Sequence, residues 1–392
     1  EGKKLLLTGS VTTDFYDYLT VFDGGINDQK LLDAVSSKSD GETYDIGAVL
    51  SSGKTLTLWF KSDASRVFDG LDLKVSVVEP TKYAAVSVVE DESHKKYGII
   101  DGNFKGTDAI NITEEIAVEN VVFNRPFSTS GFSTLMLPFS FNAKNFENVE
   151  SVIEFDGMTT NDKDELAVGM RYVWCSAEVE EYLESKADPS TPEKYEHCNS
   201  KSDVFTGEMT AYTPYMVQMG GSELVFKEGA TLEVTPAKLS GASDGSGWTF
   251  MPVLQKKVFT KEETKDGRIW GFAGEERNGA TIGKFVRFGK GAYVQPFRAY
   301  LVSDKPQLVS ASPNAQYVAR PAVGETASLL ENIDVVIVSR GNDGEKHTTT
   351  IGKFNTRTGE FKMLRDYDLK GRKTNIMNRA QGAYYGKKVL KK

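Results

Sequence analysis

Short runs in which apolar and polar residues alternate recur along this chain, and they constrain its fold most strongly. Within Thr55–Phe60 every second residue is Leu or Phe, and Leu71–Val77 alternates again after a polar loop. A period of two places successive side chains on opposite faces of a strand. The runs are rich in aromatic and β-branched residues and are separated by Gly, Asn and Asp, which is typical of antiparallel sheets. The sequence therefore predicts an all-β protein.

Length and charge limit what this protein can do. The chain has 392 residues and a formal net charge of −8, although 13 basic and only three acidic residues follow position 345. This length exceeds what one hydrophobic core usually serves. The acidic main body disfavours binding to polyanions such as nucleic acid. The apolar run at Leu5–Leu7 is too short for a signal-peptide core, so we expect a signal already removed or a start inside a longer gene product.

Residues 1–80 resemble part of a CUB domain. The matching segments are YDYLTVFDGG at 16–25 and SSGKTLTLWFKSDASRVFDGLDLKVSVV at 51–78. They correspond to the second half of that β-sandwich, and its first half has no counterpart. A half-sandwich leaves a sheet edge unpaired, which favours an internal start. The resemblance predicts a partial CUB-like β-sandwich over 1–80.

The same resemblance implies a Ca²⁺ site. Many CUB domains bind Ca²⁺ through an acid before an aromatic–leucine pair and through a Ser-Asp-x-Ser loop, positions that match Asp17, Asp63 and the carbonyl of Ser65. Oxygen ligands suit this ion. The family's upstream glutamate has no match here, with only Asp14 nearby, and Arg66 stands where many members carry a polar ligand. The alternative is that Asp17 and Asp63 cap turns and face water.

Residues 81–305 predict a larger antiparallel β-sandwich with one short helix. Strand-like runs follow one another at the spacing of a sandwich or barrel. The helix is predicted at Ser176–Lys186, which carries Glu near its start and Lys at its end. Cys175 and Cys198 flank this excursion, and both a disulfide and two unpaired thiols fit the sequence. Segments such as TFMPVL at 249–254 and GAYVQPFRAYLV at 291–302 resemble a recurrent β-domain of large bacterial cell-surface proteins, which implies no catalytic residues.

Aromatic residues in this region fit either a sugar-stacking face or a core. They are Trp248, Trp270, Tyr293, Phe297 and Tyr300. We expect core packing, because alternating aromatics in sandwiches usually form cross-strand pairs. The three histidines fall in polar segments, and no HExxH, GxSxG, Walker A or CxxC motif is present. With the surface-protein resemblance, these observations predict a protein that is not an enzyme.

The final residues predict a sorting signal for secretion rather than a nucleic-acid-binding site. Residues 306–328 are rich in Pro, Ala and Ser and predict a linker, after which Ile333–Val338 predicts a buried strand and 341–344 a hairpin turn. YDLKGR at 367–372 and QGAYYGKKVLKK at 381–392 resemble the carboxyl-terminal sorting domain of type IX secretion cargo. That resemblance implies outer-membrane secretion and attachment machinery as a partner of residues 329–392. The alternatives are a structural β-domain with a basic edge and, least favoured, a nucleic-acid site.

Together these patterns predict an exported cell-surface protein, extracellular or at the outer membrane. We expect it to act in adhesion or in binding an extracellular polysaccharide or protein. The main alternative is the non-catalytic, substrate-targeting part of a secreted polysaccharide-degrading enzyme. A self-contained hydrolase is a further alternative, since only two suitably placed carboxylates are needed for glycoside hydrolysis.

Overall fold

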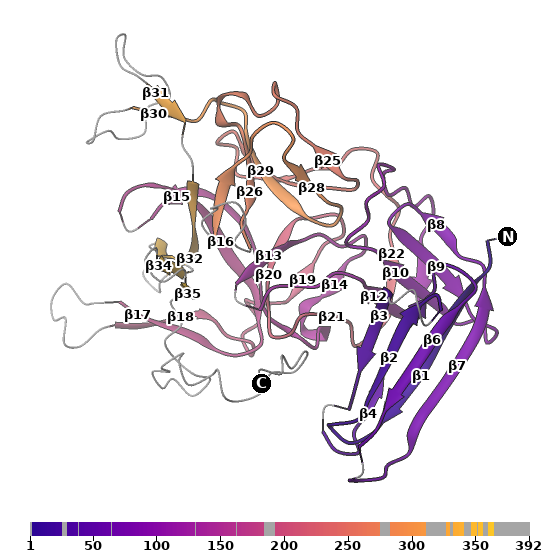
Figure 1. Cartoon of the computed structure of the whole chain (residues 1–392). Coiled ribbons are helices and arrows are strands. Elements are labelled where there is room, and N and C mark those ends of the chain that lie inside the picture. Colours follow the sequence, from indigo (N-terminus) through magenta and orange to yellow (C-terminus); the bar gives the residue numbers. More distant parts are fainter. Residues whose placement is uncertain are drawn as a thin grey trace. The chain divides into compact units, whose positions relative to one another are not determined.

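Figure 1 shows the computed structural model of the chain, which describes residues 2–25, 30–37, 39–63, 65–129, 131–161, 163–183, 193–274, 283–310, 327–329, 332–340, 346–350, 352–355 and 360–363. Within these ranges the regular structure is almost entirely strand. The helical turns described are the short 3₁₀ segments η1 (Ala143–Asn145) and η2 (Lys265–Gly267). The prediction of an all-β protein is confirmed.

The chain packs as two compact units. Unit 1 comprises Glu1–Asp101, Ala109–Asn124 and Val225–Val234, and unit 2 comprises Gly102–Asp108, Arg125–Leu224 and Thr235–Lys392. This division differs from the predicted ranges 1–80 and 81–305. The physical reason is a shared core, because Leu6 and Val78 lie in one buried cluster with Val89, Tyr97 and Ile99.

Unit 1 is built from small sheets. One places β1 between β7 on one side and β4 and β5 on the other, a second has the order β3-β2-β6, and a third has the order β21-β12-β10-β9-β8. The strands are β1 (Lys4–Thr12), β2 (Tyr18–Asp23), β3 (Lys30–Val35), β4 (Thr43–Asp45), β5 (Val49–Leu50), β6 (Leu56–Lys61), β7 (Gly70–Val78), β8 (Thr81–Tyr83), β9 (Val86–Glu90), β10 (Lys96–Ile100), β11 (Ile116–Val118), β12 (Asn120–Phe123), β21 (Leu224–Val225) and β22 (Ala230–Leu232).

The first sheet is the middle layer of unit 1. Successive residues of β1 point to opposite faces, and both faces are covered. Leu7 packs into a cluster with Leu19 and Val21 of the second sheet. Leu6 packs into the other cluster, with Val89 and Ile99 of the third sheet. This arrangement explains why adjacent leucines of one strand are both fully buried.

Unit 2 is dominated by an 11-stranded sheet with the order β13-β20-β15-β16-β32-β27-β26-β29-β24-β23, in which β33 also pairs with β32. Its strands are β13 (Phe132–Leu135), β15 (Val149–Thr160), β16 (Leu166–Cys175), β20 (Tyr215–Met219), β23 (Ala242–Ser243), β24 (Trp248–Pro252), β26 (Ile269–Phe272), β27 (Lys284–Arg287), β29 (Ala299–Ser303), β32 (Asn332–Arg340) and β33 (Lys346–Thr350). Short pairs flank the sheet: β14 (Phe141–Asn142) with β19 (Glu208–Met209), β17 (Val179–Leu183) with β18 (Glu193–Cys198), β25 (Lys257–Val258) with β28 (Tyr293–Val294), β30 (Leu308–Ser310) with β31 (Ala327–Leu329), and β34 (Gly352–Asn355) with β35 (Glu360–Met363).

This sheet curls so that its last strands return to β15. The Asp244 carboxylate accepts a hydrogen bond of 2.8 Å from the Met158 N–H, and the rings of Phe155 and Phe250 lie 6.3 Å apart. Gly157 marks a register shift in β15 and has a φ of 111°, which glycine tolerates best. The curl encloses one apolar cluster that includes Trp270.

The strand β32 lies inside this sheet. It pairs in parallel with β16 and antiparallel with β27 and β33. Ile333, Val335 and Ile337 point into the apolar cluster, so the predicted buried strand is confirmed. The pairing of β32 with β33 is the predicted hairpin, whereas the predicted turn at 341–344 lies outside the described residues.

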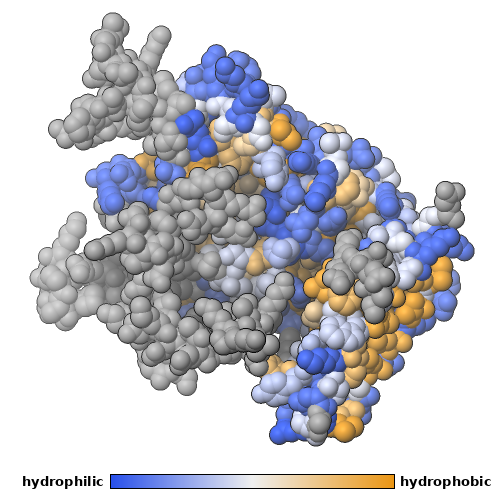
Figure 2. All heavy atoms as spheres, viewed as in Figure 1, coloured by the Kyte–Doolittle hydropathy of each residue, from blue (hydrophilic) through white to orange (hydrophobic). Residues whose placement is uncertain are grey.

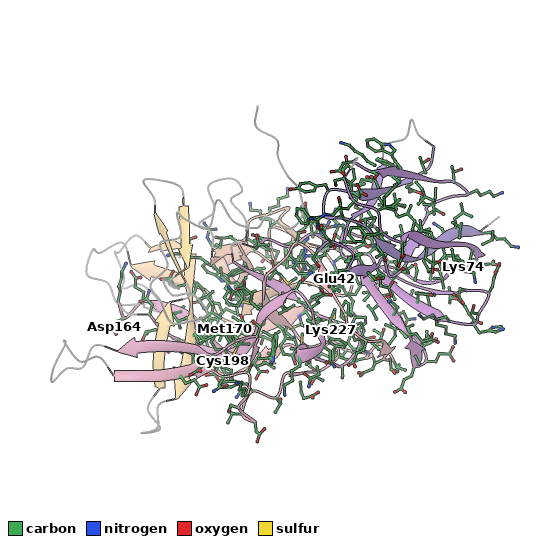
Figure 3. The ribbon with its side chains drawn as sticks, turned by 90° about the horizontal axis from the view of Figure 1, so that it is seen from below. Glu42, Lys74, Asp164, Met170, Cys198 and Lys227 are labelled. Carbon is green, nitrogen blue, oxygen red and sulfur yellow. A yellow bond between two sulfur atoms is a disulfide. The ribbon has the colours of Figure 1, made fainter. Side chains whose placement is uncertain are left out.

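The predicted helix at Ser176–Lys186 is wrong, because Val179–Leu183 forms β17 and pairs with β18. A disulfide joins Cys175 to Cys198, with 6.2 Å between the Cα atoms, and fixes the base of this hairpin (Figure 3). Tertiary constraints of this kind override a moderate helix propensity. His197 and His347, which the sequence placed in polar segments, lie in β18 and β33.

Candidate metal centre

Acidic side chains from two loops converge at one end of unit 1. Asp14 and Asp17 belong to the loop between β1 and β2, and Asp63 follows β6. One carboxylate oxygen from each lies within 4.8 Å of the others. The pairing of β2 with β6 explains the convergence, since Tyr18 lies opposite Lys61 and the two loops leave the same end of the sheet.

Asp14 and Asp17 are buried and hold the first loop in shape. The Asp14 carboxylate accepts hydrogen bonds from the backbone N–H groups of Tyr16, at 2.7 Å, and Asp17, at 3.0 Å. This is the local capping that Asp offers in turns. It leaves the second Asp14 oxygen facing the other loop, where it accepts a hydrogen bond of 2.8 Å from the Ser65 hydroxyl.

Asp17 connects the two loops directly. One of its oxygens accepts a hydrogen bond of 2.8 Å from the Asp63 N–H, and the other accepts one of 3.1 Å from the Ser62 hydroxyl. The Ser65 N–H donates to the exposed Asp63 carboxylate at 2.7 Å, and the Ser65 hydroxyl lies 2.6 Å from the same carboxylate, so its single hydrogen is shared between Asp14 and Asp63. We call Asp14, Asp17 and Asp63 the acid cluster. Its carboxylates are held in place by hydrogen bonds from hydroxyl and backbone amide groups.

These donors stabilise the charged form of Asp14. The Ser65 hydroxyl is the largest cause that lowers its pKa, and the N–H groups of Tyr16 and Asp17 and the charge of Arg66 lower it further, although burial opposes them. Arg66 itself forms an ion pair with Asp40. Asp14 therefore stays a carboxylate at neutral pH, which is the state that a cation requires.

The structure brings together the three residues that the resemblance named, Asp17, Asp63 and Ser65. For Ser65 the contacts run through its hydroxyl and N–H, whereas the family pattern uses the carbonyl. Asp14 is the member of the acid cluster that the resemblance did not name. Its position three residues before Asp17 was the only sequence signal, and the turn that folds it back explains how it reaches the cluster.

Two aromatic side chains lie exposed beside the acid cluster. Phe15 and Tyr16 occupy the same loop, with Tyr16 61% exposed and the ring centroids 5.6 Å apart in an edge-to-face arrangement. A second aromatic contact joins the exposed Trp59 to the half-buried Tyr18, whose ring also lies 5.5 Å from the Lys61 ammonium. This end of unit 1 thus combines carboxylates with accessible aromatic surface.

The aromatic residues of unit 2 are mostly core. Trp248, Trp270 and Phe297 are buried, and Tyr300 packs against Phe259 with the ring centroids 5.0 Å apart. Tyr293 is exposed, beside the Lys256 ammonium. The predicted core packing is confirmed for four of the five residues.

Among the residues the structure describes, no second group of three acidic, histidine or cysteine side chains meets as the acid cluster does. No helix within the described ranges is long and apolar enough to cross a membrane. The chain matches no protein-family model and no curated protein. The segments 367–372 and 381–392 lie outside the described residues, so the sorting-domain resemblance stays a prediction.

Proposed function

We propose that this chain is an exported protein that acts at the cell surface, in adhesion or in binding an extracellular polymer or protein. The observation that carries the proposal is the disulfide between Cys175 and Cys198, whose sulfur atoms are enclosed at the base of a hairpin. Disulfides persist in oxidising compartments outside the cytosol. The proposal assigns no catalytic role.

The acid-cluster end of unit 1 is the proposed binding surface. Exposed aromatic rings supply much contact area at little entropic cost, and Tyr16 and Phe15 offer such rings beside buried charge. Tyr16→Ala should therefore weaken ligand binding without changing the melting temperature. Tyr293→Ala in unit 2 is the matched control, because Tyr293 is similarly exposed.

Ca²⁺ is the proposed cofactor of this surface. The donor set fits it, because Asp14, Asp17 and Asp63 offer only hard oxygen ligands from two loops. The bound ion would neutralise the carboxylates and hold the two loops together. Calorimetric titration of the whole chain should give heat that Asp63→Ala abolishes and Asp203→Ala, an exposed acid in unit 2, preserves. Absence of heat in the unmodified chain would refute the site.

The carboxyl-terminal segment is the proposed signal for export and surface attachment. Deleting everything from Ile333 would not test this, because β32 is a central strand of unit 2. The useful truncation removes only residues 364–392, beyond the last strand described. In the native host it should leave the protein folded but undisplayed. Normal surface display of this truncation would contradict the sorting role.

A second candidate, the substrate-targeting part of a polysaccharide-degrading enzyme, is favoured by one observation. The exposed Trp59 ring contacts the half-buried Tyr18 ring on the outer side of the β3-β2-β6 sheet, where sugar rings can stack. Pull-down against cellulose, xylan and host glycoproteins separates the two candidates. Binding to plant polysaccharides alone, lost in Tyr18→Ala, would favour the enzyme-associated role. Turnover of a substrate by this chain would contradict both.

A further inference from the structure

On the edge strands β6 and β7 of unit 1, apolar side chains lie on the core-facing side of the sheet and are still exposed to solvent. Leu56 of β6 and Leu73 of β7 pack against one apolar cluster. Every second residue of a strand shares a face, so residues of β6 and β7 that lie an even number of positions from these two also face inward. They are Leu58, Phe60, Leu71, Val75 and Val77, and their exposed fractions lie between 36% and 61%. We call these five side chains the seam.

The seam lies between two strands that each have a free edge. Within the described residues, β6 pairs with β2 alone and β7 pairs with β1 alone. Figure 2 shows hydrophobic side chains gathered along the part of unit 1 where Figure 1 draws these strands. An apolar edge of this length is a template for pairing with another strand.

The centres of the two edges lie at corresponding heights. Because β2 follows β1 after the short loop 13–17, Leu19 lies near Val11 in their shared cluster. Leu19 pairs with Phe60, and Val11 pairs with Leu71. Two residues further along each strand, Val21 pairs with Leu58 and Gly9 pairs with Leu73. Trp59 lies between Leu58 and Phe60 on β6, and Leu73 lies between Leu71 and Val75 on β7, so the two positions are within about one residue of each other along the strands.

We propose that the seam binds a second copy of this chain across a twofold axis that passes through Trp59 and Leu73. Such an axis makes both edges pair antiparallel at once and joins two open sandwiches into one continuous sandwich. Around Leu73 it places Leu71 opposite Val75 of the second copy. Around Trp59 it places Leu58 opposite Phe60 of the second copy, so that four of the five seam side chains meet apolar partners on the inner face, while Val77 lies opposite Asp69.

The charges on β7 favour this partner and this register. Asp72 and Lys74 are exposed on the face of β7 opposite the seam, and Lys74 is visible in Figure 3. An axis at Leu73 sets Asp72 opposite Lys74 of the second copy, and the same contact occurs twice. The Lys74 ammonium also lies 3.6 Å from Glu92, an exposed contact that a closer partner can replace. On β6 the register sets Lys61 opposite Thr57, so that no like charges meet.

Sedimentation velocity across a concentration series tests this inference on the whole chain. The unmodified chain should form a dimer, and Val75→Lys should abolish it, because an ammonium would enter the seam on both copies. Asp72→Lys should raise the dissociation constant about tenfold by setting Lys opposite Lys twice. The swap Asp72→Lys with Lys74→Asp should restore it. Asp203→Lys in unit 2 controls for net charge.

Cross-linking fixes the register. Trp59→Cys should form a covalent dimer under mild oxidation, because position 59 faces itself across the axis, and Asp203→Cys should not. A chain that stays monomeric throughout the series overturns the proposal, as does a dimer that Val75→Lys and Asp72→Lys leave unchanged. A monomer that binds an added polysaccharide or extended peptide, and loses that binding in Val75→Lys, also overturns it and assigns the seam to that partner.

Discussion

The two units start from the same sequence pattern and end with different cores. In unit 2 the large sheet curls, and its last strands return to β15, so inward-facing residues such as Ile333 and Phe250 are buried. In unit 1 the sheets end at β6 and β7, and inward-facing residues such as Val77 stay exposed. Alternation decides which face of the sheet a side chain lies on. Whether that side chain is buried depends on whether other strands cover the edges of the sheet.

The clearest way to break this comparison is to remove equivalent inward-facing side chains from both units. Ile333→Ala should cost about 2–5 kcal/mol of unfolding free energy, because it leaves a cavity in a closed core. Val77→Ala should change it by less than about 0.5 kcal/mol in dilute protein, since little of that side chain is buried. Chemical denaturation measures both. Similar costs at the two positions would contradict the distinction between a closed and an open core.

The disulfide should contribute the next largest effect, and only in unit 2. Replacing Cys175 and Cys198 together by Ala should cost about 2–4 kcal/mol, because the unfolded chain loses a cross-link that closes a loop of intermediate length. Intact mass before and after reduction and alkylation establishes the bond in the unmodified chain. If both thiols alkylate without reductant, the bond is absent and the support it gives to export is lost.

The closure of the unit 2 sheet depends on Gly157. A Cβ atom there would lie 2.6 Å from an Asp244 carboxylate oxygen, at a backbone φ of 111°. Gly157→Ala should therefore cost about 1–3 kcal/mol through backbone strain. Gly220→Ala in the same unit is the control, since its nearest neighbour would be 3.5 Å away. Equal melting temperatures for the two variants would mean that the curl of the sheet does not depend on the close contact between Gly157 and Asp244.

Surface charge should matter least to the comparison. The Lys257 ammonium is the main cause that lowers the pKa of the Glu263 carboxyl to about 2, and the Thr260 N–H adds to it. Since the folded pKa lies below the unfolded value of about 4.3, this stabilisation is present above that pH and is lost as the pH falls toward 2.

Lys257→Met should raise the Glu263 pKa toward its usual value, as measured by carboxyl NMR titration. Lys256→Met, whose ammonium faces the Tyr293 ring, should leave that pKa unchanged. Stability at neutral pH should change little in either variant, because exposed ion pairs contribute little. A Glu263 pKa that is the same in Lys257→Met as in the unmodified chain would contradict the contact between the two side chains.

The local patterns predicted the strands well. Leu56–Lys61, Gly70–Val78 and Asn332–Arg340 form where alternation or an apolar run placed them. The strand at 179–183 was missed, since its Glu-rich sequence favours helix and only the bond from Cys175 to Cys198 reveals the hairpin. Long-range pairing was also out of reach. Nothing in the sequence sets Ala167 beside Asp334, because parallel pairing over such a separation depends on the whole sheet.

The candidate site was predicted in part. The resemblance named Asp17, Asp63 and Ser65, and the structure brings them together. Asp14 was visible only as a nearby acid, because its role comes from a turn that folds it back onto Asp17. The resemblance to half a sandwich predicted an unpaired sheet edge, but alternation alone did not show that Val75 and Val77 would be exposed there.

Hydrogen–deuterium exchange at two protein concentrations tests the central comparison most directly. Amides of β32 should be protected at both concentrations, because that strand pairs on both sides within one chain. The amides of β6 and β7 that point to the free edges should exchange quickly in dilute protein and become protected when the protein is concentrated, as these edges pair with a second copy. Protection of β6 and β7 that equals that of β32 in dilute protein, or that does not change with concentration, would contradict the account.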